Sequence, residues 1–214
     1  MNIIRNFLAV SALSFASLAG AATGEELVRP IQDQWAEIKY KQPEKQQEAG
    51  YNKLAEQARK LVEANPGVAE LLIWEGIVLS SEAGAKGGLG ALSLAKAAKA
   101  KLDEALKLND KALAGSAHTS IATLYAKVPG WPVAFGSDSK AEEHFKKSLA
   151  INPNGIDPNF FYGEYLADHD RVAEARTYLE TALKAPPRPG RELADNGRRQ
   201  EIQALLNKLN KDNK

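Results

Sequence analysis

The sequence predicts an all-α protein, and two observations carry that prediction. Apolar residues recur every three or four positions through most of the chain, which is the spacing of a helix with one buried face. Terminating residues recur as well, because Pro66, Asp110, Pro153 and Pro187 are separated by 44, 43 and 34 residues. A period in this range is typical of helical repeats, whose units bury their apolar faces only by stacking on one another.

The apolar spacing predicts nine helices, which we place at residues 25–41, 46–64, 68–82, 91–108, 116–127, 140–151, 157–167, 171–184 and 191–210. Helix 68–82 is apolar on most sides, so we expect its neighbours to cover it on both sides. Pro30 is expected in the first turn of its helix, where a missing amide proton costs little. Asp157 and Pro158 are expected to cap and open helix 157–167.

Residues 1–21 have the three parts of a secretory signal peptide. Arg5 supplies the positive charge, residues 7–18 are apolar, and Ala19-Gly20-Ala21 has the form of a cleavage site. A buried helix over residues 1–21 is the alternative. The apolar run is too short to span a bilayer, and no later segment reaches the roughly 20 apolar residues that spanning needs. We therefore expect cleavage and a periplasmic protein.

Charge and cysteine content exclude several classes. Removing Arg5 leaves 27 basic and 27 acidic residues, whereas a binder of nucleic acid or of an anionic membrane needs a basic excess. The chain has no cysteine, so the fold has to be held by packing without disulfides even in an exporting context.

A second-helix pattern of small and apolar residues occurs three times. Its members are Ala98, Leu102, Ala105 and Asp110, then Ala141, Phe145, Ser148 and Pro153, then Ala175, Leu179, Ala182 and Pro187. Gly163 stands in the first helix of the last unit, and Ala122 stands where the glycine would be in the unit before it. On these residues the chain resembles the tetratricopeptide-repeat family, well over 157–187 and poorly before residue 66.

The resemblance implies antiparallel helix hairpins wound into a right-handed superhelix. It divides the chain into an N-terminal helix and linker at 22–45, repeats at 46–187, and a C-terminal capping helix and tail at 188–214. The middle units carry inserts at about 83–91 and 128–137. With these inserts and the export signal, the chain is also similar to the T-component family of tripartite ATP-independent periplasmic transporters, which implies association with a periplasmic substrate-binding protein.

Residue patterns that carry chemistry are weak in this chain. The glycines of segment 83–91 lack a preceding strand and a Gly-Lys-Ser/Thr motif, so we interpret the segment as a flexible turn and not as a phosphate loop. His118, His144 and His169 form no metal-binding pair on one helix, and His144 fits a solvated face. There is no Gly-x-Ser-x-Gly elbow. We predict no catalytic, metal or cofactor site, although a hydrolase remains a third hypothesis.

Segment 128–137 contains two rigid prolines, Pro129 and Pro132, and presents the apolar side chains of Trp131, Val133 and Phe135 outside regular helix. One interpretation is that the segment folds onto its own hairpin and buries Trp131 against the next repeat, since large exposed apolar patches are uncommon. The other is that Trp131 and Phe135 line a binding groove, because exposed aromatic side chains often anchor partners.

Four arginines lie within twelve residues, at positions 188, 191, 198 and 199. They are suited to clamping a carboxylate on a partner. The alternative is structural, because Glu192, Asp195 and Glu201 lie close enough in sequence to neutralise most of this charge.

The first helix of each tetratricopeptide hairpin lines the concave face, so the resemblance also implies a binding surface. The candidate residues, with those of the loop, are Ile73, Ile77, Thr123, Lys127, Trp131, Phe135, Phe160 and Glu164. Such a lining suits a protein helix, an apolar ligand, or the chain's own terminal helix acting as a plug. We therefore expect a non-enzymatic adaptor that binds a protein through this face and the inserted loops. The alternative is a transporter-associated component that handles a small apolar ligand.

Overall fold

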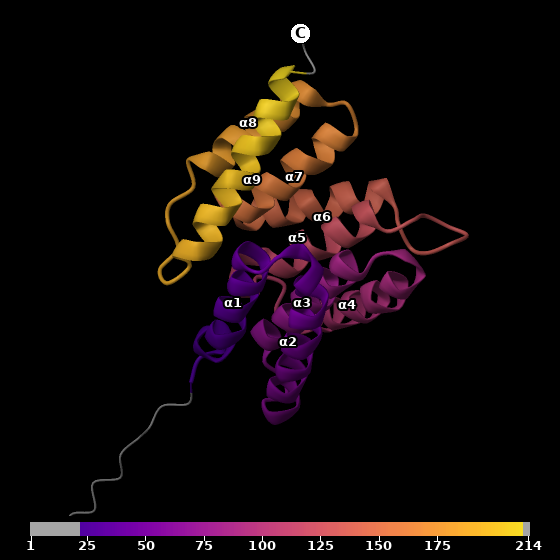
Figure 1. The fold of residues 1–214 in the computed structure, drawn as a ribbon, viewed down its shortest axis with the longest axis vertical. Coiled ribbons are helices and arrows are strands. Elements are labelled where there is room, and N and C mark those ends of the chain that lie inside the picture. The colour runs from indigo at the N-terminus through magenta and orange to yellow at the C-terminus, as the bar shows by residue number, and fades with distance from the viewer. Residues whose placement is uncertain (1–21, 212–214) are drawn as a thin grey trace, which may run out of the picture.

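A computed structural model describes residues 22–211, so the expected signal peptide lies outside the described residues. Within this range the chain folds into nine helices without a named strand, which confirms the all-α prediction (Figure 1). None of these helices combines the length and apolar character needed to cross a membrane. The helices are α1 (Gly24–Lys41), α2 (Glu44–Ala64), α3 (Ala69–Lys86), α4 (Gly88–Leu108), α5 (Ala112–Lys127), α6 (Asp138–Ile151), α7 (Ile156–Asp168), α8 (Val172–Leu183) and α9 (Glu192–Lys211).

Consecutive helices pack in adjacent pairs. The closest pairs are α3 with α4, α5 with α6, and α7 with α8, and α1 also contacts α2 (Figure 1). The second helix of each pair contacts the first helix of the next, as α4 does with α5 and α6 with α7. The arrangement is compatible with a tetratricopeptide-like helical repeat.

The same close contact recurs in the first and last of these pairs. A Cβ added to Gly163 would lie 2.9 Å from Cγ of Leu179, and one added to Gly76 would lie 2.7 Å from Cγ of Leu102. The spacing that we expected around Gly163 is therefore a real packing constraint, because a core leucine leaves no room for a methyl group. Gly76 is its counterpart, which the insert between α3 and α4 hid from the sequence pattern.

Five helices form a closed cycle of contacts. Helix α3 contacts α5, α5 contacts α7, α7 contacts α9, α9 contacts α1, and α1 contacts α3. Figure 1 shows α1 and α9, the first and last helices, lying beside one another. The two ends of the helical array therefore meet.

Two apolar clusters hold the helices together. The larger cluster runs from α3 to α9 and contains the fully buried side chains of Leu102, Phe145 and Leu179. The smaller one joins α1, α2, part of α3 and Ala194 of α9 around Trp35 and Trp74, whose ring centroids are 6.0 Å apart at 71°. Helix α3 contributes to both clusters and is covered on several sides, as its apolar sequence predicts.

The glycine-rich segment 83–91 is mostly helical, so our expectation of a flexible turn there is wrong. Helix α3 continues to Lys86 and α4 begins at Gly88, which leaves Gly87 with a φ of 65° as the break. Alanine and lysine have high helix propensity and outweigh the cost of single glycines, roughly 1 kcal/mol each. The φ of Gly87 lies in the left-handed region, where only glycine is free of strain.

Pro30 lies inside α1, past its first turn, because α1 begins at Gly24. Thr23 and Glu26 form a capping box in which Thr23 Oγ1 accepts from the Glu26 amide at 3.2 Å and Glu26 Oε2 accepts from the Thr23 amide at 2.7 Å. This cap satisfies free amides at the N-terminus and fixes the start of the helix there.

A left-handed turn precedes the regular part of α5. Leu113, Ala114 and Gly115 have φ values of 47°, 53° and 76°. Non-glycine residues in this region cost about 1 kcal/mol or more each, so the surrounding packing has to hold the turn in place. Ile151 provides part of that packing, with its Cδ1 3.0 Å from where a Cβ of Gly115 would lie.

Candidate partner-binding surfaces

The loop between α5 and α6, residues 128–137, is braced by backbone hydrogen bonds. The amide of Gly136 donates to Pro129 O at 2.9 Å, and the amide of Ser137 donates to Tyr125 O at 3.0 Å. A Cβ on Gly136 would overlap the carbonyl oxygen of Val128, so the two arms of the loop approach too closely for any other residue. The loop stands out from the helices as a closed finger (Figure 1).

Apolar side chains of this loop point in two directions. Phe135 packs edge-on against Tyr125 with ring centroids 5.8 Å apart and anchors the loop to α5. Trp131 is 89% exposed and Val133 is 60% exposed. The loop therefore does not bury Trp131 against the next repeat, and Phe135 is the aromatic residue of the loop that packs against the hairpin.

A row of first-helix residues corresponds to the predicted binding face. We call it the first-helix row; its members are Ile73, Ile77, Thr119, Thr123, Phe160 and Glu164. Ile73 is fully buried, Phe160 is 5% exposed, and Ile77, Thr123 and Glu164 are half-buried. Much of this row is therefore covered by the protein itself.

Helix α9 covers the Phe160 end of the first-helix row. The guanidinium carbon of Arg198 lies 4.4 Å from the ring centre of Phe160 and 4.5 Å from that of Phe161. Ile73 at the other end belongs to the larger apolar cluster. Of the three occupants that the lining suits, the chain's own terminal helix is the one that contacts the Phe160 end of the row.

Lys127, predicted as a groove residue, is engaged within the protein. Its Nζ lies 2.8 Å from a carboxylate oxygen of Asp168 and 3.4 Å from one of Glu164. About half of the Lys127 side chain remains exposed. The three residues link α5 to α7 by a surface ion-pair network, a kind of contact that contributes little unless desolvated.

Two arginines, Arg188 in the link before α9 and Arg198 in α9, form an internal network with Asp157. Arg188 Nη1 lies 2.6 Å from Asp157 Oδ2, and Arg198 Nε donates to Asp157 Oδ1 at 2.9 Å. Arg188 also pairs with Asp195, and Arg198 with Glu201, each at 2.6 Å. The structural interpretation of the arginine cluster is therefore the one that the structure supports.

Asp157 has a different role from the helix cap that we expected. Helix α7 is capped at Gly155, and the Asp157 carboxylate turns to Arg188 and Arg198. Burial alone raises the pKa of a carboxyl group, but the two guanidinium groups outweigh it and hold the pKa of Asp157 well below its usual range. About 30% of the Asp157 side chain is still accessible, so solvent screens part of this attraction.

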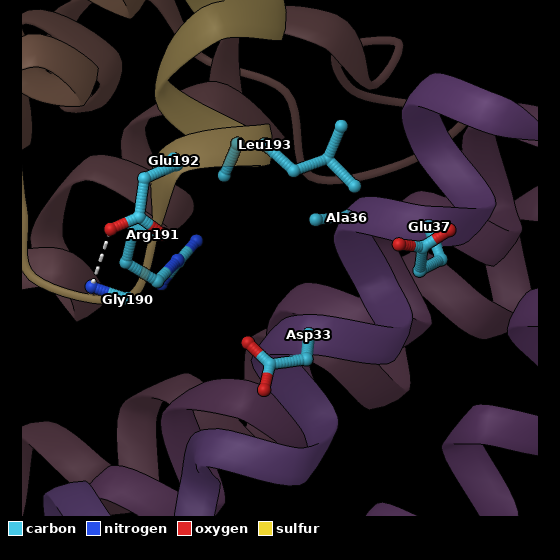
Figure 2. Close-up of a pocket in the computed structure, with 8 residues that line it drawn as sticks. Asp33, Ala36, Glu37, Gly190, Arg191, Glu192 and Leu193 are labelled. Carbon is cyan, nitrogen blue, oxygen red and sulfur yellow. Dashed lines mark hydrogen bonds between the residues drawn. The ribbon is translucent and has the colours of Figure 1, made fainter.

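A hollow of about 180 Å³ lies between α1 and the turn before α9. Figure 2 shows Asp33 on one wall and Arg191 on the opposite wall, with the Gly190 amide donating to Glu192 Oε1 at 3.2 Å. Arg191 also lies 5.1 Å over the ring of Trp74. The lining carries both signs of charge, which does not favour an apolar ligand.

A second hollow of about 200 Å³ lies between the start of α5, the α6–α7 turn and the α8–α9 link. Its walls include the left-handed turn at Leu113 and the polar side chains of Ser116, Asn152 and Arg188. Both hollows are smaller than the roughly 300–1,000 Å³ of typical small-ligand sites.

Two histidines that lie far apart in sequence meet across the α5–α6 hairpin. The Nδ1 atoms of His118 and His144 are 3.0 Å apart. His144 was expected on a solvated face, but burial and the neighbouring His118 lower its pKa to about 4. The spacing between the two residues would have revealed the pair only once the lengths of the loop and of both helices were known.

Comparison with known protein families gave no match to this chain, and comparison with curated proteins gave none either. The candidate surfaces therefore have to be judged by their own chemistry. Of these surfaces, the loop is the one that presents large apolar side chains directly to solvent.

Proposed function

We propose that this protein is an exported, non-enzymatic adaptor built as a right-handed tetratricopeptide-like superhelix. It binds a protein partner through the α5–α6 loop, with Trp131 as the central anchor and Val133 beside it. The observation that carries the proposal is the 89% exposure of Trp131 on a loop whose backbone is fixed by hydrogen bonds.

Exposed tryptophan is costly for an isolated protein and useful at an interface. Tryptophan is enriched among the residues that dominate binding energy, because its large ring is desolvated when it enters a partner's pocket. The bonds at Gly136 and Ser137 hold the loop before binding, so little conformational freedom is lost on association. We therefore expect a partner with an apolar pocket that accepts an indole ring.

Charge and cavity size support a protein partner over other ligands. The balanced count of 28 basic and 27 acidic residues does not favour nucleic acid or an anionic bilayer. The two hollows are small and mixed in charge, which does not favour a small apolar ligand. Since the first-helix row is largely covered, we assign the loop the main role in binding and the row a minor one.

The resemblance to transporter T-components suggests which partner to test first. If the chain is exported, a periplasmic substrate-binding protein produced by the same cells is the first candidate. The handling of a small ligand by such a complex is the alternative function and would involve the partner as well as this chain.

Site-specific photo-crosslinking tests the proposal in the cells that make the protein. A photoreactive phenylalanine analogue replaces Val133, which is 60% exposed and leaves the Trp131 anchor in place, and a matched control carries the same analogue at Leu108, which is 49% exposed at the end of α4. We expect one defined protein adduct from position 133 and none from position 108.

Affinity measurements with the captured protein complete the test. Removing an anchor of this type costs about 2–4 kcal/mol, so Trp131→Ala is expected to weaken binding 30-fold or more. Leu89→Ala serves as the control. Leu89 is 87% exposed at the start of α4, outside the loop, so this substitution should leave the affinity unchanged. Equal affinity of Trp131→Ala and the unmodified protein would sink the proposal.

A further inference from the structure

His118 and His144 form a paired site that the proposed function does not use. His118 comes from α5 and is 7% exposed, and His144 comes from α6 and is half-buried. Their ring centroids are 5.1 Å apart with a tilt of 44°, and the two Nδ1 atoms face each other at 3.0 Å. Without another ligand, one imidazole donates its Nδ1–H to the other.

The separation of the two nitrogen atoms matches the bite of a metal ion. With metal–nitrogen distances of about 2.0–2.1 Å, donors 3.0 Å apart subtend about 95° at the metal. Neighbouring positions of a tetragonal site subtend about 90°, whereas a tetrahedral site would need the nitrogen atoms about 3.3 Å apart. The separation set by the hydrogen bond is therefore also compatible with two neighbouring positions of a tetragonal site.

We propose that His118 and His144 bind one divalent late transition-metal ion through their Nδ1 atoms, with Cu²⁺ preferred over Ni²⁺ and Zn²⁺. Imidazole nitrogen suits all three ions, the general order of affinities places Cu²⁺ first, and tetragonal nitrogen and oxygen sites are typical of Cu²⁺ and Ni²⁺. Water fills the remaining positions, because no cluster of three or more histidine, cysteine or carboxylate ligands occurs among residues 22–211.

Proton balance permits this exchange at neutral pH. Burial lowers the pKa of both histidines, so both are neutral there and each carries one ring proton. Before the metal enters, the acceptor ring carries its proton on Nε2 and the donor ring carries its proton on Nδ1. When the metal enters, the donor's proton moves through solvent from Nδ1 to Nε2 of the same ring. No net proton is released, and both Nδ1 lone pairs point at the ion.

Charged groups around the pair are mixed. Asp103, Asp110 and Glu143 attract a cation, and Lys147 opposes it. Tyr125 packs against His144 with ring centroids 5.9 Å apart and closes one side of the site. The balance is compatible with a bound dication.

Calorimetry on the untagged protein tests the site. CuCl₂, NiCl₂ and ZnCl₂ are titrated separately at neutral pH, and we expect a single Cu²⁺ site that binds at least tenfold more tightly than the other two ions. Electron paramagnetic resonance of the Cu²⁺ complex should show two imidazole nitrogen ligands in a tetragonal field.

Matched histidine variants separate this site from adventitious binding. His144→Gln keeps a polar group next to His118 but removes one ligand, so Cu²⁺ affinity should fall at least tenfold. His169→Gln alters a histidine that contacts Tyr165 O and Asp138 and should bind Cu²⁺ as the unmodified protein does. His118→Gln gives a second test if His144→Gln unfolds.

The proposal is overturned by three outcomes. One is that the unmodified protein binds Cu²⁺ no more tightly than His144→Gln. Another is a resonance spectrum with fewer than two imidazole nitrogen atoms. The third is no binding at all, which would leave a hydrogen-bonded histidine pair only.

Discussion

Helices α1 and α9 meet at the closing point of the contact cycle, yet they differ in how far they rely on charged groups. Helix α1 buries Val28, Ile31 and Trp35 in the smaller apolar cluster. The first half of α9 places Ala194 in that same cluster and adds charged groups around Asp157, and its second half is held by an apolar stripe that includes Ile202. Apolar contacts depend little on salt, whereas partly exposed ion pairs are screened by it.

The comparison shows which end of the array is able to respond to solution conditions. Burial of apolar area stabilises α1 over a wide range of pH and ionic strength. The start of α9 depends on charges that acid and salt weaken. Opening of the first-helix row at the Phe160 end is therefore easier to achieve than opening beside α1.

The largest expected effect comes from truncating the α1 anchor. Trp35→Ala removes a ring that contacts Trp74 and an indole N–H that donates to Ser81 Oγ at 2.8 Å. We expect the free energy of unfolding to fall by about 3–5 kcal/mol, and to fall equally at low and high salt. Urea denaturation at two ionic strengths measures both quantities.

Trp131→Ala is the matched control for that experiment. It removes the same side chain from an exposed position, so the free energy of unfolding should change by less than about 0.5 kcal/mol. A loss similar to that of Trp35→Ala would show that the loop is a structural element and not a free surface.

Asp157→Asn should lower the free energy of unfolding by a smaller amount, because it leaves Arg188 and Arg198 without their shared carboxylate. Breaking buried pairs costs about 3–5 kcal/mol, and the partial exposure of Asp157 reduces the expected loss to about 2 kcal/mol. The penalty should shrink at high salt, in contrast to that of Trp35→Ala. Urea denaturation again provides the measurement.

The same variant predicts a pH dependence. The pKa of Asp157 is lower in the folded than in the unfolded protein, so its stabilisation is complete above about pH 5 and declines as pH falls below about 4. The difference in stability between the unmodified protein and Asp157→Asn should therefore narrow on acidification. A difference that stays constant from pH 7 to pH 3 would contradict the assigned ion pairs.

Hydrogen exchange of backbone amides tests the contrast between α1 and α9, and the change that we expect is smaller. Raising the salt concentration should increase exchange in the first half of α9, where Asp195 and Arg198 lie, by a few-fold. Exchange within α1 should stay unchanged. Mass spectrometry of peptides from both helices reports them in one sample, and equal responses would remove the distinction.

Arg29→Ala should have the smallest effect. Arg29 Nη1 donates to Pro189 O at 3.0 Å and joins α1 to the turn before α9 through one exposed hydrogen bond. The expected loss is about 0.5 kcal/mol. Thermal unfolding is sensitive enough to detect it, and a loss above about 2 kcal/mol would mean that this single contact holds the cycle closed.

Periodicity in the sequence was sufficient to place the helices, because amphipathic spacing and proline stops are local signals. Gly163 could be recognised from its distance to Ala175 and Ala182. Its counterpart Gly76 could not, since the longer connection between α3 and α4 changes the spacing to Leu102. Segment 83–91 was misjudged because glycine content was weighed above the helix propensity of its neighbours.

Residues of the candidate site depended on contacts that spacing does not reveal. The role of Asp157 follows from Arg188 and Arg198, which are 31 and 41 positions away. The histidine pair joins residues 26 positions apart across a hairpin. Which aromatic residue of the loop packs inward was not visible in the spacing either, since Phe135 contacts Tyr125 and Trp131 stays exposed.

The meeting of the first and last helices limits how this architecture is able to evolve. An open array grows when a unit is duplicated at either end, but a new hairpin here would have to separate α1 from α9. The number of hairpins is therefore set by closure. Complete unfolding of one terminal helix should also cost more than in linear arrays, since each end contacts the other as well as its own neighbours in the chain.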